Sequence, residues 1–195
     1  MVSTVDTGKR HLILGAAVQV FSEKGFHNAR VEEIAQVAGI GKGTIYQYFS
    51  TKEQLFLEMV RAGMDLYLGE IRTAMNRPAP IDQRLCALVE MHLSFAFRHR
   101  NLARLAMLHP DSISDSVKET FIETRILIHR ELVYHLDHAI QNGEIRPCGA
   151  NLTAWMLIGI LNSLGANLIF EETDDLDLAG TARDTAALIL YGLKS

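Results

Sequence analysis

Acidic and imidazole side chains suited to binding a metal ion fall on one face of a predicted helix. Glu131 and His135 are four residues apart, and His135 and His138 are three residues apart, so the three side chains share that face. No cysteine lies near them in the sequence, and the chain has no HExxH motif. We interpret these histidines as surface or pocket residues and expect no metal site.

The sequence lacks the short motifs that bring catalytic groups together. It has no glycine-rich phosphate loop, no nucleophile elbow and no pair of carboxylates that composition alone would nominate for acid–base chemistry. We therefore expect no catalytic residues, no cofactor and no enzymatic activity.

Polar side chains embedded in apolar helical runs are candidates for fixing a small ligand. Arg125, His129 and Asn162 are residues of this kind, and the long apolar helices around them can enclose a cavity. For each apolar residue taken singly, an ordinary core position is the simpler interpretation. The candidate ligand-binding residues are Met91, Phe95, Met107, Phe121, Arg125, His129, Trp155 and Asn162.

The segment from Val31 to Phe49 predicts two short helices joined by a tight turn. Apolar residues occupy positions i, i+3, i+4 and i+7 of the first helix, and Gly39 then supplies the left-handed backbone of a sharp turn. Ile40 returns to the core, and the second helix, from about Lys42 to Tyr48, buries Ile45. This is the pattern of a helix-turn-helix, whose second helix enters the major groove of DNA. An ordinary pair of core helices is the alternative.

The distribution of charge favours DNA binding more than the total charge does. The chain of 195 residues has a formal net charge of -4. Residues 1–52 contain six basic and four acidic residues, a net charge of +2, so the remainder carries -6. A basic tip on an acidic body is compatible with a DNA-binding protein whose body faces away from phosphate.

We expect a cytoplasmic protein that does not enter the membrane. Cys86 and Cys148 are far apart and read as free thiols in a reducing compartment, and residues 2–10 have no apolar core of a signal peptide. Residues 154–170 are uncharged, but a spanning helix needs about 20 apolar residues. Because this segment also contains Asn162 and Asn167, a buried helix of the core or of a subunit interface is the better interpretation.

Helical periodicity runs through the whole chain, and strand signals are almost absent. A capping box, either Ser50 with Glu53 or Thr51 with Gln54, predicts the start of the long fourth helix. We expect an all-α fold of about nine helices, at residues 8–24, 31–38, 42–48, 51–75, 81–99, 102–108, 116–141, 152–170 and 178–193.

Four short motifs follow one another in the first third of the chain: Gly25-Phe26, Val31-x-x-Ile34-Ala35-x-x-Ala38-Gly39-Ile40, Lys42-Gly43-Thr44-Ile45-Tyr46-x-Tyr48-Phe49 and Lys52-Glu53-x-Leu55. With them, the segment from about Lys9 to Met59 resembles the DNA-binding domain of TetR-family transcriptional regulators. The remaining two thirds resembles the family only in the number and order of its helices. The resemblance implies a homodimeric repressor that binds an operator in double-stranded DNA and is released by a small-molecule effector.

The resemblance also assigns the residues that face DNA. Lys42 and Thr44 lie at the N-terminal end of the recognition helix, which reaches base edges. The full set is Arg30, Lys42, Gly43, Thr44, Tyr46, Gln47, Tyr48 and Lys52. Ala29, Arg30 and Gly41 stand where the family usually has Thr or Ser. We expect Asn28 to cap the helix that Ala29 cannot, and Arg30 to replace a hydroxyl contact to phosphate.

Within the family, the sequence most resembles repressors that respond to fatty acyl-CoA. The similarity lies in Gly25-Phe26-His27, the motif of the recognition helix, Asn101-Leu102-Ala103 and Gly143-Glu144-Ile145. A long-chain acyl-CoA is therefore our expected effector, and the alternative is a multidrug-type repressor that senses lipophilic or cationic compounds. A helical interaction or membrane-associated protein with a degenerate helix-turn-helix is the alternative from a different class.

The expected domains are a helix-turn-helix DNA-binding domain at residues 1–52 and an α-helical ligand-binding and dimerisation domain at residues 53–195. The last two helices are apolar on more than one face and rich in glycine and alanine. We expect them to pair with their twofold mates as a four-helix bundle.

Overall fold

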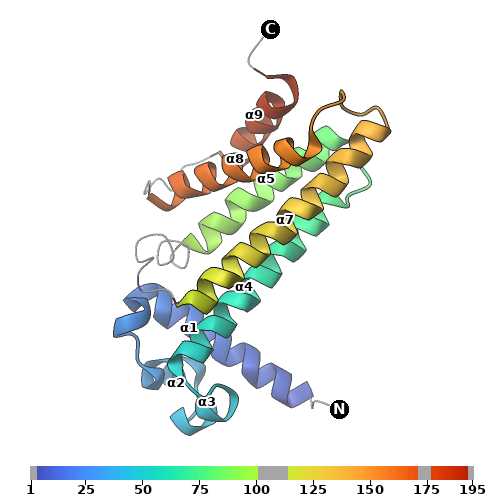
Figure 1. Cartoon of the computed structure of the whole chain (residues 1–195). Helices are drawn as coiled ribbons and strands as arrows, with labels where there is room; N and C mark the ends of the chain where they lie inside the picture. Colours follow the sequence, from blue (N-terminus) through green and yellow to red (C-terminus); the bar gives the residue numbers. More distant parts are fainter. Residues whose placement is uncertain (1–3, 101–113, 171–176, 193–195) are drawn as a thin grey trace. The chain divides into compact units, whose positions relative to one another are not determined.

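The computed structural model describes residues 4–100, 114–170 and 177–192, and every regular element in these ranges is an α-helix. Figure 1 shows the helices with their labels. They are α1 (Thr4–Asn28), α2 (Val31–Ala38), α3 (Lys42–Tyr48), α4 (Lys52–Met75), α5 (Ile81–Arg98), α7 (Asp115–Gln141), α8 (Ala150–Phe170) and α9 (Leu178–Tyr191). The all-α expectation is confirmed. The helix expected at residues 102–108, and Met107 with it, lie outside the described residues.

The chain divides into two compact units. Among the described residues, the first unit contains residues 4–64 and 114–121, and the second contains residues 65–100, 122–170 and 177–192. Helix α4 begins in the first unit and ends in the second, so the division falls inside a continuous helix. The domain boundary expected after residue 52 stays a prediction.

The first unit is built around aromatic and branched side chains from α1 to α4. Phe21 of α1 packs edge-on against Phe56 of α4, with 5.0 Å between ring centroids, and Phe26 lies 5.1 Å from the same ring. Ile45 and Phe49 are almost completely buried in this core. Gly25, with φ 74° and ψ 168°, interrupts the helical backbone within α1 where the sequence predicts its end. These contacts hold α2 and α3 on a rigid base.

The second unit has its own apolar core, with α5 packed against both α8 and α9. Leu88 and Leu93 of α5 are buried, together with Leu132 of α7 and Ala154 of α8. Ala182 of α9 is fully buried in the same core. Small side chains on α8 and α9 therefore serve close packing within this chain as well as any packing between chains.

Candidate DNA interface and ligand-binding core

The turn between α2 and α3 has the geometry that the sequence predicts. Gly39 adopts a left-handed backbone with φ 66° and ψ 29°. The N–H of Gly39 donates to Gln36 O at 3.2 Å, and the N–H of Ile40 donates to Ala35 O at 3.0 Å. These two bonds satisfy carbonyls at the end of α2 and fix the direction in which α3 leaves.

Helix α3 buries one side and exposes the other. Ile45 is 1% exposed, whereas Lys42, Gly43, Tyr46 and Gln47 are exposed. Thr44 and Tyr48 are half-buried, and Tyr48 packs against the first core. Any two of these four exposed residues are either adjacent or three to five residues apart in a seven-residue helix. They therefore form a continuous outer surface. Such a surface fits the major groove.

Lys42 is the charged group of this surface. Its ammonium group forms an ion pair with Glu32 of α2 and lies 5.7 Å from the ring centre of Tyr46. The hydrogen bond to Glu32 raises the pKa of Lys42 above its ordinary value, and the same bond lowers the pKa of Glu32. Lys42 is therefore positively charged at neutral pH, and both partners are exposed enough for a DNA phosphate to compete with Glu32.

Arg30, rather than Asn28, occupies the N-cap of α2, so the expected cap was wrong. The backbone N–H of Arg30 donates to the Glu33 carboxylate at 3.1 Å, and Glu33 also accepts from Lys24 at 2.8 Å. The amide of Asn28 instead donates to Lys24 O at 3.3 Å, at the end of α1. Glu33 thus binds the N–H of the N-cap residue, as the acidic residue of a capping box does, and Arg30 remains an exposed candidate for a phosphate contact.

Lys52 has a structural role that the sequence did not reveal. Its ammonium group donates to the carbonyls of Phe26, His27 and Ala29 at 2.8, 3.3 and 3.2 Å, and lies 4.6 Å from the ring centre of Phe26. In this structure the group closes the turn between α1 and α2. Its expected contact with phosphate stays a prediction, and it would require the ammonium group to leave part of this arrangement.

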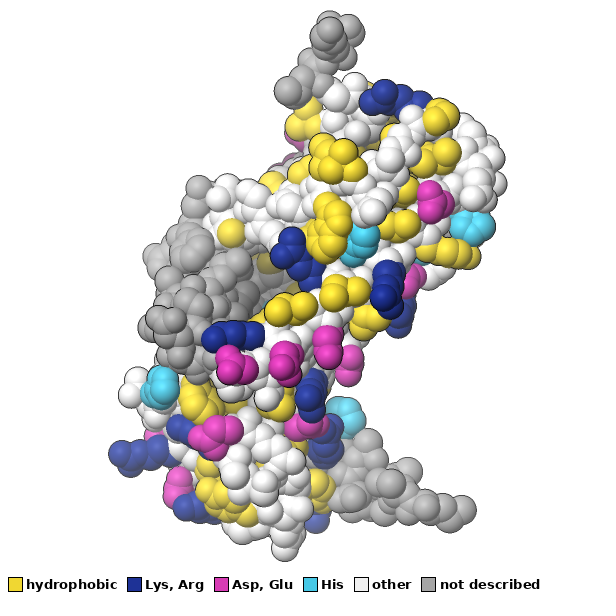
Figure 2. All heavy atoms as spheres, viewed as in Figure 1, with side chains coloured by type: hydrophobic (Ala, Val, Ile, Leu, Met, Phe, Trp, Pro, Cys, Tyr) yellow, Lys and Arg dark blue, Asp and Glu magenta, His cyan; other side chains and the backbone are white. Residues whose placement is uncertain are grey.

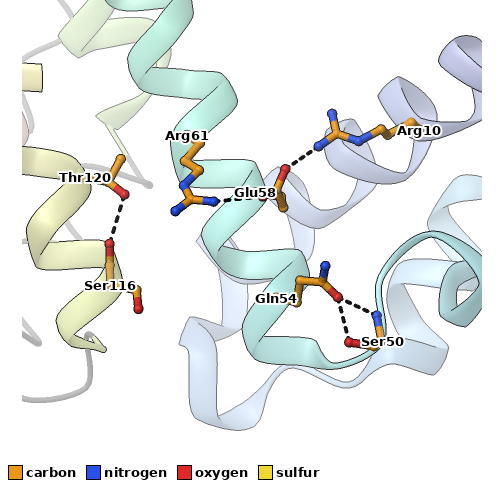
Figure 3. A network of polar contacts seen from close by, with 7 residues as sticks. All are labelled: Arg10, Ser50, Gln54, Glu58, Arg61, Ser116 and Thr120. Atoms are coloured by element: carbon orange, nitrogen blue, oxygen red, sulfur yellow. Dashed lines mark hydrogen bonds and ion pairs between the residues drawn. The ribbon is translucent and has the colours of Figure 1, made fainter. Parts of the chain in front are cut away.

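The start of α4 is fixed by polar contacts that Figure 3 draws from close by. The Gln54 amide oxygen accepts from the Ser50 N–H at 2.7 Å, as Figure 3 shows. Thr51 Oγ1, which that figure does not draw, accepts from the Gln54 N–H at 3.0 Å. Thr51 is therefore the cap, as in the second of the two alternatives. One turn further, Glu58 pairs with Arg10 of α1 and, at 3.1 Å, with Arg61. These contacts fix the start of α4 and join α4 to α1.

The expected ligand-binding residues do not all come together. Met91 packs against the core of the second unit, whereas Phe121 packs against the core of the first. The Phe95 ring packs at a tilt against Tyr67 of α4, with 4.9 Å between ring centroids. Asn162 is exposed on α8. Which of these residues touch a ligand stays a prediction.

Three of the expected residues do meet, between α7 and α8. The His129 ring stacks on the Trp155 indole with centroids 4.1 Å apart, and the Arg125 guanidinium lies 4.9 Å from the indole centre. His129 Nε2 is also 3.3 Å from Asn151 O. Trp155 remains 38% exposed, so this cluster lies at the surface of the second unit and not deep in its core.

A buried polar pair in the second unit escaped the sequence analysis. The Tyr67 hydroxyl and His92 Nδ1 are 2.6 Å apart, while Nε2 of His92 is buried and makes no hydrogen bond to any described residue. A Cβ on Gly165 would lie 2.8 Å from that nitrogen, so α8 approaches His92 where only glycine fits. Burial lowers the pKa of His92 to about 4, although the Leu161 backbone acts in the opposite direction and raises it by less. Burial also raises the pKa of Tyr67.

Large apolar side chains are exposed on α8 and α9. Leu152 and Met156 of α8 are 66% and 59% exposed, and Leu188 and Tyr191 of α9 are 53% and 75% exposed. Figure 2 shows hydrophobic side chains gathered over α7 and α8 on the face that it draws. An exposed apolar surface of this kind usually marks an interaction site.

None of the described helices is long and apolar enough to cross a membrane. Nor does the described part of the chain contain a group of three or more histidine, cysteine or acidic residues placed to hold a metal ion. Glu131 and His135 do approach each other, with 3.5 Å between Oε1 and Nε2.

Two family models match the chain. Residues 13–59 match the model described as bacterial regulatory proteins of the tetR family, and residues 78–166 match the model described as the tetracyclin repressor-like C-terminal domain. The first match contains the whole helix-turn-helix, and the second extends from the turn after α4 into α8.

The relatives and solved structures that resemble this chain include regulators of fatty acid metabolism. The fatty acid metabolism regulator protein of Bacillus subtilis (strain 168) is 25% identical over 189 residues, which cover 93% of each chain. The structure of the fatty acid degradation regulator FadR from Bacillus halodurans has a TM-score of 0.79 and 28% identity, and covers 94% of this chain and 99% of that one. The structure of FadR from Bacillus subtilis in complex with stearoyl-CoA has a TM-score of 0.78 at 24% identity, with the same coverage.

Proposed function

The chain belongs to the TetR family of bacterial regulatory proteins, and from this premise we propose that it is a repressor released from its operator by a long-chain acyl-CoA. It is a ligand-responsive DNA-binding regulator with a helix-turn-helix in its first unit. In this proposal it acts as a homodimer in the cytoplasm on a palindromic site and catalyses no reaction.

The exposed side of α3 is the observation that supports DNA recognition. Lys42 and Thr44 at its N-terminal end approach base edges, and the Tyr46 and Tyr48 hydroxyls donate to phosphates. Gln47 reaches a base or a phosphate, and Gly43 allows the backbone to come close. In a symmetric dimer the two recognition helices then lie about 34–36 Å apart, one turn of DNA.

The proposed dimer forms through α8 and α9. Their exposed apolar side chains would form a surface that a twofold mate covers with the same surface. Four helices would then pack as a bundle, as is common for paired antiparallel helices. Glycine and alanine on both helices allow the backbones to approach closely.

The similarity to regulators of fatty acid metabolism supports an acyl-CoA as effector. An acyl chain needs an apolar environment, and the second unit offers buried apolar side chains from α4, α5, α7 and α8. Met91, Phe95 and Trp155 are proposed as contacts of the ligand, with Arg125, His129 and Asn162 as polar groups at its ends.

The proposed switch acts through α4. This helix begins directly after the recognition helix and continues into the second unit, so a shift of α4 on ligand binding is passed to α3. The ligand changes DNA affinity only by its difference in affinity for the two states. A loss of about 100-fold in DNA affinity requires about 2.7 kcal/mol of coupling. Operator DNA must then weaken ligand binding by the same factor.

Release of DNA by acyl-CoAs of increasing chain length tests this function. Promoter DNA from the neighbourhood of the chain's own gene is bound to the protein in a mobility-shift assay, and each acyl-CoA is titrated into the complex. We expect long-chain acyl-CoAs to release the DNA, and free coenzyme A to leave the complex intact because it has no acyl chain to bury.

Two results contradict parts of the proposal. If lipophilic cations release the DNA and no acyl-CoA does, the chain is a multidrug-type repressor. If no DNA from that region shifts at moderate salt, the proposed role of α3 fails, and a helical interaction protein becomes the better description.

A further inference from the structure

One end of the second unit contains a polar hollow of about 330 Å³. It lies where the turn after α4, the first turn of α5 and the last turns of α7 meet, at the end that carries the α4–α5 and α7–α8 connections (Figure 1). We call it the end cavity. It is lined by Met75, Asn76, Arg77, Pro78, Ala79, Arg84, Tyr134, His135, His138, Asn142 and Glu144.

Basic and imidazole groups with few acceptors gather around this hollow. Arg84 Nε is buried and has no hydrogen-bond partner among the described residues, while His135 Nε2 is buried with Glu131 Oε1 3.5 Å away. The Arg77 guanidinium is exposed and makes no ion pair or hydrogen bond with any residue that the structure describes. An arginine Nε always carries a proton and cannot accept, so a buried Nε–H without an acceptor is costly.

The one acidic residue that lines the end cavity is already engaged. Both oxygens of Glu144 lie 3.2 Å from Arg84 Nη2, and Oε2 also accepts the N–H of Ile81 at 2.7 Å, which caps α5. Glu144 is held in place by the turn at Gly143, whose φ is 73°. The charge of Glu144 is thus matched by Arg84, and Arg77 leaves the lining with a positive charge.

His135 and His138 bring imidazole groups to the same hollow. The Tyr134 ring packs edge-on against both, with centroids 5.2 and 4.6 Å away. His135 is 4% exposed, and Glu131, its neighbour on α7, pairs with Arg72 at 3.1 Å. The helix face that the sequence offered as a metal site therefore presents ring nitrogens beside two arginines, a combination that suits an anion and not a cation.

We propose that the end cavity binds a small oxyanion, a phosphate or carboxylate group, held by the free Arg77 guanidinium with Arg84 and the two histidines. Arginine recognises such groups through a planar fork of donors. An oxyanion in the hollow meets the exposed guanidinium of Arg77, and Asn142 adds an amide to the lining. None of the residues that line the end cavity is among the proposed contacts of DNA or of acyl-CoA, so the site is distinct from both.

Titration with inorganic phosphate tests the site on the full chain without DNA or acyl-CoA. The imidazole ¹⁵N resonances of His135 and His138 are followed by NMR at pH 7, with sodium chloride keeping the ionic strength constant. We expect saturable shifts in the wild type. Arg77→Gln should weaken phosphate binding about tenfold, as expected for loss of a charge-assisted hydrogen bond. Because Arg77 is exposed and unpaired, this change should leave the fold intact.

Arg130→Gln is the matched control, because Arg130 is exposed on the same helix as the histidines but does not line the end cavity. It should bind phosphate as the wild type does. A parallel titration with acetate separates the two sources: shifts with both probes indicate a general oxyanion site, and shifts with phosphate alone indicate a phosphate site. The proposal fails if neither probe gives a saturable shift, or if Arg77→Gln and Arg130→Gln bind equally. Neither failure bears on release of DNA by acyl-CoA.

Discussion

Lys42 and Tyr46 combine exposure, charge and a polar tip on one turn of α3. The ammonium group lies 5.7 Å from the tyrosine ring centre, and both side chains are exposed, whereas Ile45 is buried. Their neighbours in the first core hold the backbone in place, so the two side chains can be changed with little effect on folding.

Lys42→Ala and Tyr46→Phe should therefore weaken operator binding and leave the protein folded. We expect Lys42→Ala to lower affinity about tenfold and to reduce the slope of log affinity against log salt by about one. Tyr46→Phe should lower affinity for all sites about equally, because a phosphate contact carries no sequence information. Fluorescence anisotropy at several salt concentrations measures both effects.

Lys118→Ala is the control for this pair of variants. Lys118 is also exposed and also paired with a carboxylate, Asp115 at 3.4 Å, but it lies on α7. It should bind the operator as the wild type does. If Lys42→Ala and Tyr46→Phe both bound the operator with wild-type affinity at moderate salt, α3 would not be part of the DNA interface.

His92 makes stability depend on pH. Its pKa is about 4 in the folded chain, against an ordinary value of 6.5, because burial disfavours the charged form. The unfolded chain therefore binds more protons between these values, and stability falls as pH falls through that window. Between pH 7 and pH 5 the loss from this residue is about 2 kcal/mol. Urea unfolding at the two values measures it.

His92→Gln provides the comparison, because glutamine does not titrate. We expect its stability to change less than that of the wild type between pH 7 and pH 5, even though the substitution destabilises the core at both. His135, whose pKa burial also lowers, adds a loss of the same sign in both proteins. Equal changes in wild type and variant would show that His92 is not buried as a neutral ring.

The resemblance to the family placed Lys42, Tyr46 and Gln47 on the DNA-facing side of α3, and the structure leaves all three exposed. The role of Lys52 was not predictable in this way, since its three carbonyl partners lie 23 to 26 residues earlier in the chain. The contact of His92 with Tyr67 and its approach to Gly165 likewise depend on how three helices pack. Long-range contacts of this kind leave no local signal in sequence.

At the scale of elements, the α2–turn–α3 unit depends on one left-handed residue. Gly39 has a positive φ that side chains other than glycine adopt at a cost, while Gly43 lies within α3 and shows no positive φ. Neither has an atom within 4 Å of the position that a Cβ would take. The two glycines therefore differ in backbone conformation and not in available space.

Gly39→Ala should destabilise the protein by about 1 kcal/mol, the cost of placing alanine in the left-handed region. Gly43→Ala should leave stability unchanged or higher, because alanine is the better helix former. The same Gly43→Ala change should weaken DNA binding if the backbone must approach the groove. Chemical denaturation and anisotropy on the same samples separate the two effects.

The outcome that counts against this account is a Gly39→Ala protein as stable as the wild type, or a Gly43→Ala protein with unchanged affinity for DNA. The first result would show that stability does not depend on the left-handed turn at Gly39. The second would show that the backbone at Gly43 does not approach DNA closely.

Local signals predicted most helix boundaries, and failed where the local signal was weak. Gly39 and the Thr51–Gln54 cap have clear sequence patterns, and the helices end or begin where these patterns predict. The start of α2 was predicted less well, because no Ser, Thr, Asp or Asn immediately precedes Val31. The Glu33 carboxylate, three residues into the helix, instead accepts the N–H of Arg30. A cap made by the side chain of Glu33 is visible only once the backbone turn is known.

At the scale of the whole molecule, the exposed apolar side of α8 and α9 is what the sequence indicated least clearly. Ala182 and Ala186, two of the small residues of the last helix, are buried in the core of the same chain and are not left for a twofold mate. The side chains left for a partner are larger: Leu152 and Met156 on α8, and Leu188 on α9. Hydrophobicity on several faces of a helix does not say which face the chain itself covers.

This distinction decides how the proposed dimer is tested. An arginine at Ala186 would disturb the core of the chain, so loss of a dimer in that variant would have two explanations. Met156→Asp and Leu188→Asp, by contrast, change side chains that are 59% and 53% exposed in this chain. Each change appears twice in a symmetric dimer and buries two carboxylates in an apolar surface.

Met156→Asp and Leu188→Asp should each weaken the dimer by about 100-fold or more, because a charge buried without a partner costs several kcal/mol. Leu66→Asp on α4, at a side chain 51% exposed, is the control and should remain a dimer. Sedimentation at micromolar concentration measures assembly, and circular dichroism checks the fold. The monomeric variants should also lose most of their operator affinity, since one recognition helix reads only one half-site. A stable wild-type monomer, or dimers that persist in both aspartate variants, would place the interface elsewhere.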